Sequence, residues 1–489
     1  MRRTLALSTV LSLAGCAQIF GLDETSSGGG NDGKVSLSLT RASIGASVTM
    51  APLDVSMQTA TFLADDGAGG YLRVPGAVTS PGTFSAAELT EAVPVEFTLP
   101  GVTGERIWAT GARAQRGSQV VFEHPGAEPP LPNSAVAVMT TLPSAYVSGE
   151  SFKVEVVGAW MQHGVAAAEL PAVDMGSTAI MTPAIPYSMY TPMVGNSPAR
   201  FTSSDVVLFL RYRGGVLSDV LQQQLDQTDG TDTITGTMTP VATTASNLMA
   251  IIDPPALMTR YAAVRPNLTT ALAQSYAVRA APGASLGQAA GTVLASGAPA
   301  ATETSFAKAF GNPFESLGWK SVVEYATSMS RAYMIDPTHS VTLSANLSTI
   351  AEVGTDPITF DSPAGLPITI QINSTLLTAD GTSVMLDLTK PVVVDATIDR
   401  TQNTVYAARL FELDVSGANV AKTLVAEMVV TGMPQFAFPP ALFMTGHTYF
   451  IQVACYQGRF TDAASGDLQT VTLPYSSGTL DSGVFTVMP

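Results

Sequence analysis

The sequence predicts an all-β protein made of several β-sandwich modules in tandem. Hydrophobic and polar residues alternate over short runs, as in Val35, Leu37 and Leu39, and such alternation is typical of half-buried strands. Turn residues separate these runs about every 8–12 residues, a spacing that favours sandwiches or barrels over βαβ units. No fixed-period repeat is visible, so a solenoid or a propeller is not indicated.

The N-terminus has the order of a secretory signal peptide, which we place at residues 1–15. Arg2 and Arg3 precede the apolar run Leu5–Leu13, which is too short to span a bilayer as a permanent helix. The residues Leu13-Ala14-Gly15-Cys16 resemble the lipobox of bacterial lipoproteins. The resemblance implies that Cys16 carries lipid and anchors the protein to a membrane. An ordinary cleaved signal peptide and an uncleaved anchor are the alternatives.

The residue after the cysteine bears on location. By the sorting rule of enteric bacteria, Ala17 in place of an aspartate favours the outer membrane, at the cell surface or the periplasmic face. Residues 16–34 include the stretch SSGGG, which is typical of a flexible tether. We therefore expect a lipid-anchored tether between the membrane and the folded part.

Proline-rich and glycine-rich breaks divide the remaining chain. The breaks lie at His124–Pro132 and at Asp253-Pro254-Pro255. They predict a β-sandwich module over residues 35–125, a second β-rich module over 126–255, an irregular or mixed connecting region over 256–340 and a C-terminal β-sandwich over 341–489.

Local patterns predict individual elements. Asp66-Gly67, Asp229-Gly230 and Asp380-Gly381 are hairpin signals, because Asp-Gly tolerates positive φ. In the connecting region, Ser305–Phe310 and Ser321–Arg331 could form short helices joined by a turn at 311–314. The clearest strand candidates are Val93–Leu99, Gln119–Phe122, Ala135–Thr141, Ser151–Val157, Val206–Tyr212, Pro391–Asp395, Val405–Leu413, Leu424–Val430 and Tyr449–Ala454.

The C-terminal segment has a recognisable pattern around Tyr449. Phe438-Pro439-Pro440-Ala441-Leu442 leads through Gly446-His447-Thr448 into a strand. This resembles the approach to strand F of fibronectin type III and related immunoglobulin-like sandwiches, over roughly residues 360–489. The resemblance implies that Tyr449 bonds back to the upstream corner and that Ile451 and Val453 share its core-facing side. The resemblance implies a fold and does not indicate a ligand.

Composition excludes one class of function. The formal net charge is −16 and only 13% of residues are charged, so the overall field does not attract nucleic acid, and no basic stripe with interleaved aromatics is present. Of the 2 cysteines, Cys16 is assigned to lipid. Cys455 therefore has no disulfide partner in the chain and is expected to be a buried apolar residue.

No catalytic constellation stands out. Gly283-Ala284-Ser285-Leu286-Gly287 fits the G-x-S-x-G pattern of α/β hydrolases, but the surrounding chain lacks alternating strands and helices. His339 and His447 are the downstream candidates for a base. The acidic residues considered for glycoside cleavage, a reaction that depends on carboxylate spacing, are expected to be solvated; they are Glu88, Glu91, Glu96 and Glu105.

Metal and sugar sites are not assigned either. The histidines His124, His163, His339 and His447 are dispersed, which argues against a transition-metal site. Asp65-Asp66 and the run Asp226, Asp229 and Asp232 leave calcium open, although neither fits a twelve-residue calcium loop. Trp108, Trp160 and Trp319 could form a sugar-stacking platform, but core positions are the simpler interpretation. No phosphate-binding or dinucleotide motif is present, so no cofactor is predicted.

The predicted function is a non-enzymatic binding or structural role at the cell envelope, with a protein or polysaccharide partner. Lipidation at Cys16 is the one site assigned. A surface hydrolase acting on polysaccharide or ester bonds is one alternative. An accessory subunit of an envelope assembly is another.

Overall fold

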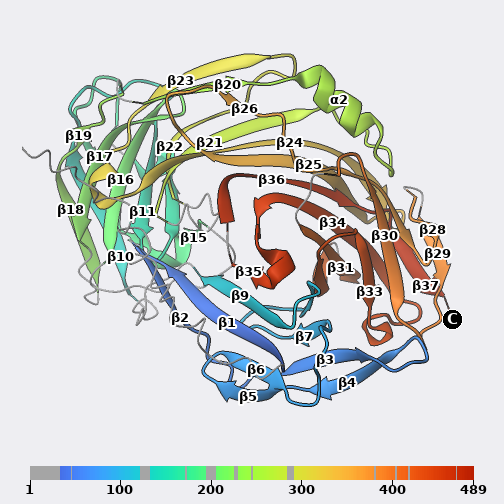
Figure 1. Cartoon of the computed structure of the whole chain (residues 1–489). Coiled ribbons are helices and arrows are strands. Elements are labelled where there is room, and N and C mark those ends of the chain that lie inside the picture. Colours follow the sequence, from blue (N-terminus) through green and yellow to red (C-terminus); the bar gives the residue numbers. More distant parts are fainter. Residues whose placement is uncertain are drawn as a thin grey trace, which may run out of the picture.

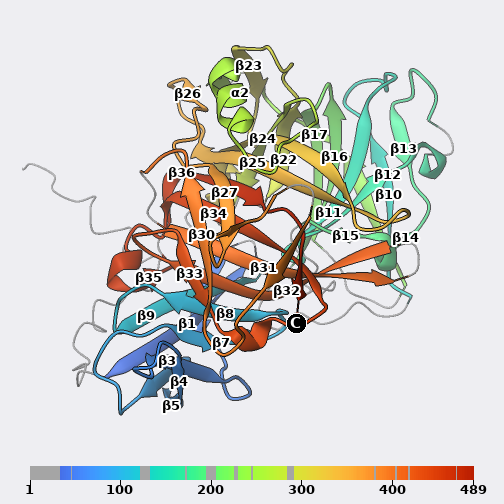
Figure 2. The same ribbon diagram turned by 90° about the vertical axis from the view of Figure 1, so that its right-hand side faces the viewer.

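The computed structural model describes residues 34–488, apart from 46, 122–132, 171–172, 194–204, 225–229, 244–245, 283–290, 379–380, 402–404, 417–418 and 470. Almost all regular secondary structure of the described chain is β-strand, arranged as several sheets in sandwich-like layers. The all-β prediction is confirmed. Figures 1 and 2 show the N-terminal strands at the bottom and α2 (Pro254–Ala262) at the top.

The largest sheet contains 20 strands. They are β3 (Ala60–Asp65), β4 (Tyr71–Pro75), β7 (Val95–Phe97), β8 (Glu105–Ala109), β11 (Ser151–Val157), β12 (Met161–Val165), β15 (Thr191–Pro192), β16 (Val206–Arg213), β17 (Val216–Gln224), β19 (Thr239–Pro240), β21 (Ala273–Ala281), β22 (Thr292–Gly297), β24 (Lys320–Met334), β25 (Ser340–Glu352), β29 (Thr382–Met385), β31 (Val405–Ser416), β32 (Asn419–Val430), β34 (Thr448–Arg459), β36 (Val471–Asp481) and β37 (Phe485–Met488).

Part of this sheet positions the candidate site. Strands β25, β36, β34, β31 and β32 pair antiparallel in that order. Strand β8 then pairs parallel to β32, and β7 pairs antiparallel to β8. Residues 105–109 therefore lie beside residues 426–430, and the sheet continues across the predicted module boundaries.

Four smaller sheets complete the layers. The sheet nearest the site holds β1 (Val35–Ile44), β2 (Val48–Pro52), β5 (Ala77–Ser80), β6 (Thr83–Ala86), β9 (Ala114–Val121) and β35 (Asp467–Leu468). The others are β10 (Ala135–Thr141), β13 (Ala179–Met181), β14 (Ile185–Pro186) and β18 (Thr231–Thr237); β20 (Ser246–Ile251), β23 (Ser305–Phe310) and β26 (Ile358–Thr359); and β27 (Pro367–Ile372), β28 (Thr375–Leu376), β30 (Val392–Ile398) and β33 (Gln435–Phe438).

The α-helix is fixed by its ends and by one arginine. Asp253 caps α2 by accepting a hydrogen bond from the Ala256 N–H at 3.0 Å, and prolines occupy its first turn, where a missing N–H costs nothing. Arg260 pairs with Asp399 at 2.6 Å. No helix of the described chain has the length and apolar character that a membrane crossing requires. Short 3₁₀ turns lie at Ala167–Glu169, Tyr187–Met189, Glu315–Leu317, Pro440–Leu442 and Ala463–Ser465.

The main core lies between the large sheet and the layers that cover it. Ile451, Val453 and Cys455 are fully buried there, on the same face of β34 as Tyr449. The predicted burial of Cys455 is confirmed, and burial raises the pKa of its thiol. The Met444 N–H donates to the Tyr449 hydroxyl at 3.0 Å, so the expected contact to the upstream corner is present. Membership of the fibronectin class stays a prediction.

Two predicted helices are wrong. Ser305–Phe310 is strand β23, paired with β20, and Ser321–Arg331 lies inside strand β24, paired with β21 and β25. The pairings with β20 and β21 join segments that are not consecutive in the chain, and β24 also forms a hairpin with β25. Neighbouring strands override weak local preference. Most of the described residues of 256–340, the region predicted as irregular or mixed, therefore lie in regular elements.

One of the three hairpin signals joins paired strands. Gly67 adopts φ +74° between β3 and β4. Asp229 and Asp380 lie outside the described residues, but the strands around them are not paired with each other. Strand β18 pairs parallel with β10, and β29 pairs parallel with β37. The two hairpin predictions at Asp229-Gly230 and Asp380-Gly381 are thus wrong.

The contact between β8 and β9 depends on a glycine. A Cβ atom at Gly117 would lie 1.8 Å from the Trp108 ring, so only glycine lets this ring pack on β9. We predict that G117A lowers the free energy of unfolding by about 1–3 kcal/mol, as overpacking does in well-packed interiors. Chemical denaturation measures the change.

G164A is the matched control, because a Cβ at Gly164 in β12 meets nothing within 4 Å. Equal destabilisation by G117A and G164A would contradict this packing role.

Candidate functional site

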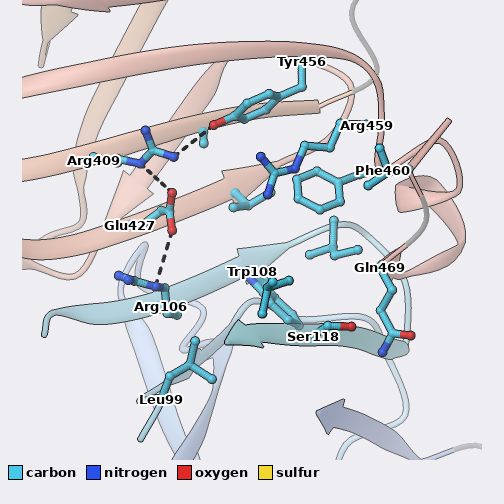
Figure 3. Close-up of a pocket in the computed structure, with 15 residues that line it drawn as sticks. Leu99, Arg106, Trp108, Ser118, Arg409, Glu427, Tyr456, Arg459, Phe460 and Gln469 are labelled. Carbon is cyan, nitrogen blue, oxygen red and sulfur yellow. Dashed lines mark hydrogen bonds and ion pairs between the residues drawn. The ribbon is translucent and has the colours of Figure 1, made fainter. Parts of the chain in front are cut away.

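The candidate site is a pocket between β9 and the face of the large sheet formed by β8, β32, β31 and β34 (Figure 3). It has a volume of about 190 Å³. Typical small-molecule pockets are about 300–1,000 Å³. The pocket therefore suits one small chemical group or one sugar-sized unit of a larger ligand.

One wall is a row of charged side chains joined by a hydrogen bond and an ion pair. Arg409 donates from Nε to Glu427 Oε1 at 2.7 Å, and Arg106 Nε lies 3.4 Å from Glu427 Oε2. Burial alone would raise the pKa of Glu427, but Arg409 and Arg106 hold it below its ordinary value. Glu427 is therefore an anion shared by two cations.

Arg409 on β31 is held from both neighbouring strands, β32 and β34. Besides Glu427, it donates from Nη1 to Gln452 Oε1 at 2.8 Å and from Nη2 to the Tyr456 hydroxyl at 3.0 Å. A guanidinium has five N–H groups, so these three bonds leave two N–H groups with no protein acceptor among the described residues. The Arg409 side chain keeps 28% of its accessible surface, so a ligand could reach it.

A third arginine comes from the end of β34. The Arg459 guanidinium lies 5.3 Å from the centre of the Tyr456 ring and 4.7 Å from that of Phe460. Cation–π contacts of this kind fix the position of a guanidinium. Figure 3 shows Arg459 directed into the same space as Arg409. The lining contains three arginines and one carboxylate, a net charge of +2.

The opposite wall is aromatic and polar. Trp108 reaches this wall from β8, with its ring packed on Gly117 of β9. It contacts Phe97 edge-to-face, with the ring centres 4.6 Å apart. The Ser118 hydroxyl is 3.0 Å from the Thr40 hydroxyl, and Gln469 Nε2 donates to Thr40 at 3.1 Å. An oxyanion facing the arginines would thus have a ring and polar groups on its other side.

Nothing in this arrangement acts as a nucleophile with an adjacent base. Glu427 is the one carboxylate among the lining residues, and its two arginine partners keep it ionised. The chemistry that the pocket offers is recognition of an anion by charge-assisted hydrogen bonds, which are stronger than neutral ones.

No protein-family model matches this chain, and no curated protein matches it.

Those sequence-predicted residues that the structure describes do not converge on one site. Cys16, His124 and the Ser285 motif lie outside the described residues. His339 contacts Asp336 at 2.7 Å, whereas His447 contacts Glu412. Trp160 and Trp319 are buried with their ring centres 6.0 Å apart, and Trp108 alone lines the pocket. The three tryptophans therefore form no common platform.

The acidic candidates differ in environment. Glu88 and Glu91 are exposed, as predicted. Glu96 is not solvated: it is buried and pairs with Arg73. Burial and the nearby Glu96 raise the pKa of Glu105. Neither Glu96 nor Glu105 lines the pocket.

The calcium candidates have local roles where they are described. Asp65 Oδ1 accepts from the Gly67 N–H at 2.7 Å, and Asp66 Oδ1 accepts from the Ala68 and Gly70 N–H groups at 2.8 Å. Asp226 and Asp229 lie outside the described residues, and Asp232 is half-buried. No group of three potential metal-ligating His, Cys, Asp or Glu side chains occurs in the described part of the chain.

Sequence reasoning missed the pocket because Arg106 is far from the other charged residues in the chain. Arg409 and Glu427 face each other in the hairpin of β31 and β32, and Arg459 lies on the adjacent β34. Arg106 joins them only through the pairing of β8 with β32. The available local signal was an arginine or a glutamate within an otherwise apolar strand pattern.

A buried acid away from the pocket makes stability depend on pH. Glu155 on β11 is fully buried, and burial raises its pKa from 4.5 to about 7 against the nearby charges of Lys153 and Arg279. The folded state then binds a proton more tightly than the unfolded state does. This contribution to stability is complete below pH 4.5 and is lost as the pH rises to about 7.

We predict that E155Q removes this dependence. Wild-type protein should lose about 3 kcal/mol of unfolding free energy over that interval through Glu155, because each pKa unit corresponds to about 1.4 kcal/mol. Denaturation at several pH values measures the loss, with E88Q as an exposed control. Identical pH profiles for wild type and E155Q would refute the prediction.

Proposed function

We propose that this protein is a non-enzymatic, lipid-anchored envelope protein that binds acidic polysaccharide, with one acidic sugar residue in the pocket. The observation that carries the proposal is Arg409, held by Glu427, Gln452 and Tyr456 with two N–H groups remaining. Guanidinium groups match carboxylate geometry well.

Charge and size support this ligand class. The chain carries a net charge of −16, but the pocket is lined with an excess of two positive charges. This local excess of positive charge favours the binding of an anion. Its volume of about 190 Å³ limits the bound part to one residue of a longer ligand. Trp108 and the hydroxyls on the other wall supply the apolar and hydrogen-bonding contacts that a sugar ring uses.

The hydrolase alternative has one observation in its favour, the proximity of Glu96 and Glu105 on adjacent strands. The ion pair between Glu96 and Arg73 gives Glu96 a structural role, which weakens its assignment as a catalytic acid. The accessory-subunit alternative stays a prediction as well.

The ligand class is tested by titrating the protein with glucuronate as a probe. R409Q should weaken binding at least about tenfold, because it removes a charge-assisted hydrogen bond. R113Q removes the same charge from an exposed site and should change affinity less than about twofold, since exposed charges are screened. Calorimetry or NMR titration gives both values.

Glucose is the neutral control and should not bind. Equal binding of glucose and glucuronate, or an equal loss in R113Q and R409Q, would contradict the proposal.

The anchor is tested separately. Cys16→Ser removes the thiol that a lipid would modify, so the variant should leave the membrane fraction and lack the mass of the acyl chains, each of which contributes about 0.8 kcal/mol per buried methylene. Fractionation and intact-mass measurement check this. Unchanged partitioning and mass would refute lipidation at Cys16 and leave the binding pocket unaffected.

A further inference from the structure

A polar row crosses five adjacent strands on one face of the large sheet. It consists of Asp481, Gln452, Arg409, Glu427 and Arg106, from β36, β34, β31, β32 and β8. Each member is the direct cross-strand partner of the next. The row runs from the buried Asp481 into the pocket, where Figure 3 shows its last three members.

The bonds along the row have a fixed direction. Gln452 donates from Nε2 to Asp481 Oδ1 at 2.9 Å, and its Oε1 accepts from Arg409 at 2.8 Å. Asp481 Oδ2 accepts from the Ser344 N–H at 2.9 Å and from the Ser344 hydroxyl at 3.1 Å. Three donors therefore face Asp481, and it acts as an acceptor on both oxygens.

This pattern determines which end of the Gln452 amide faces the pocket. A carboxylate acceptor requires the NH₂ end of Gln452, so the carbonyl end must face Arg409. Arg409 can only donate. The carboxylate at position 481 therefore orients the Gln452 amide so that its carbonyl oxygen faces Arg409. Asp481 acts in this way although Gln452 and Arg409 lie between it and the ligand.

We propose that Asp481 and Gln452 are positioning residues for the anion site, and that they orient the Arg409 guanidinium toward its ligand. The inference rests on the proposed function of the pocket. The inference requires a specific direction for each hydrogen bond. A purely structural role of Asp481 and Gln452 would not require that direction.

The claim is tested by reversing the direction of the hydrogen bonds along the row. In D481N, the Ser344 N–H still requires an oxygen on its side, so the new amide turns its NH₂ group toward Gln452. Gln452 must then flip and face Arg409 with its own NH₂ group. Two donors would oppose each other, and Arg409 would shift. We expect glucuronate affinity to fall at least about tenfold.

A second substitution should restore the direction. In D481N/Q452E, the new carboxylate at position 452 accepts from both the amide at position 481 and Arg409, with the total charge of the row unchanged. We expect the affinity of D481N/Q452E for glucuronate to lie within about threefold of wild type. A threefold change in affinity corresponds to less than half the free-energy change of a tenfold loss.

D395N is a matched control, because Asp395 also accepts from a cross-strand glutamine, Gln435, at 2.8 Å in a different sheet. It should not change affinity. Wild-type affinity in D481N, or a double variant no better than D481N, would overturn the inference.

A readout without ligand separates this inference from the proposed function. The NMR signal of the Arg409 Nε–H group, assigned by its loss in R409Q, should shift in D481N and return in D481N/Q452E. If wild-type protein fails to bind glucuronate while the signal behaves in this way, the ligand class is wrong and the positioning role holds. An unmoved signal in D481N would refute the positioning role directly.

Discussion

The pairing of β8 with β32 is the constraint on which the site depends. Five residues near the start of the folded chain pair with a strand more than 300 residues later, and this pairing places Arg106 beside Glu427. Burying Glu427 would be costly without compensation, because an isolated charge loses its hydration. Arg106 and Arg409 provide that compensation from the two strands on either side of β32. The pairing and the ionic contacts therefore stabilise each other.

Apolar clusters flank the polar row. Val405, Ala407 and Tyr456 form a cluster on one side, and Leu343, Leu413 and Phe450 form another on the other side. A buried ionic group is weak evidence for stability, since apolar residues of similar size can replace it without loss. The proposed anion binding would account for this row, because its open end carries the excess positive charge.

The sequence was sufficient for the fold class and for many strands. Ala135–Thr141 and Ser151–Val157 match β10 and β11 in both bounds, because alternation of buried and exposed residues is a local signal. The helices expected at Ser305–Phe310 and Ser321–Arg331 are strands instead, because pairing with β20, β21 and β25 decides their conformation. The pocket could not be found from the sequence because no local pattern records that Arg106 is the cross-strand neighbour of Glu427.

The most direct test of the central claim is a crystal structure of the protein soaked with selenate, whose selenium gives an anomalous signal. Selenate is an oxyanion that the arginines of the pocket should accept in place of a carboxylate. We predict an anomalous peak within hydrogen-bond distance of the Arg409 guanidinium, on the side of Arg459. An empty pocket beside well-occupied selenate sites elsewhere on the surface would contradict the claim that this pocket binds anions.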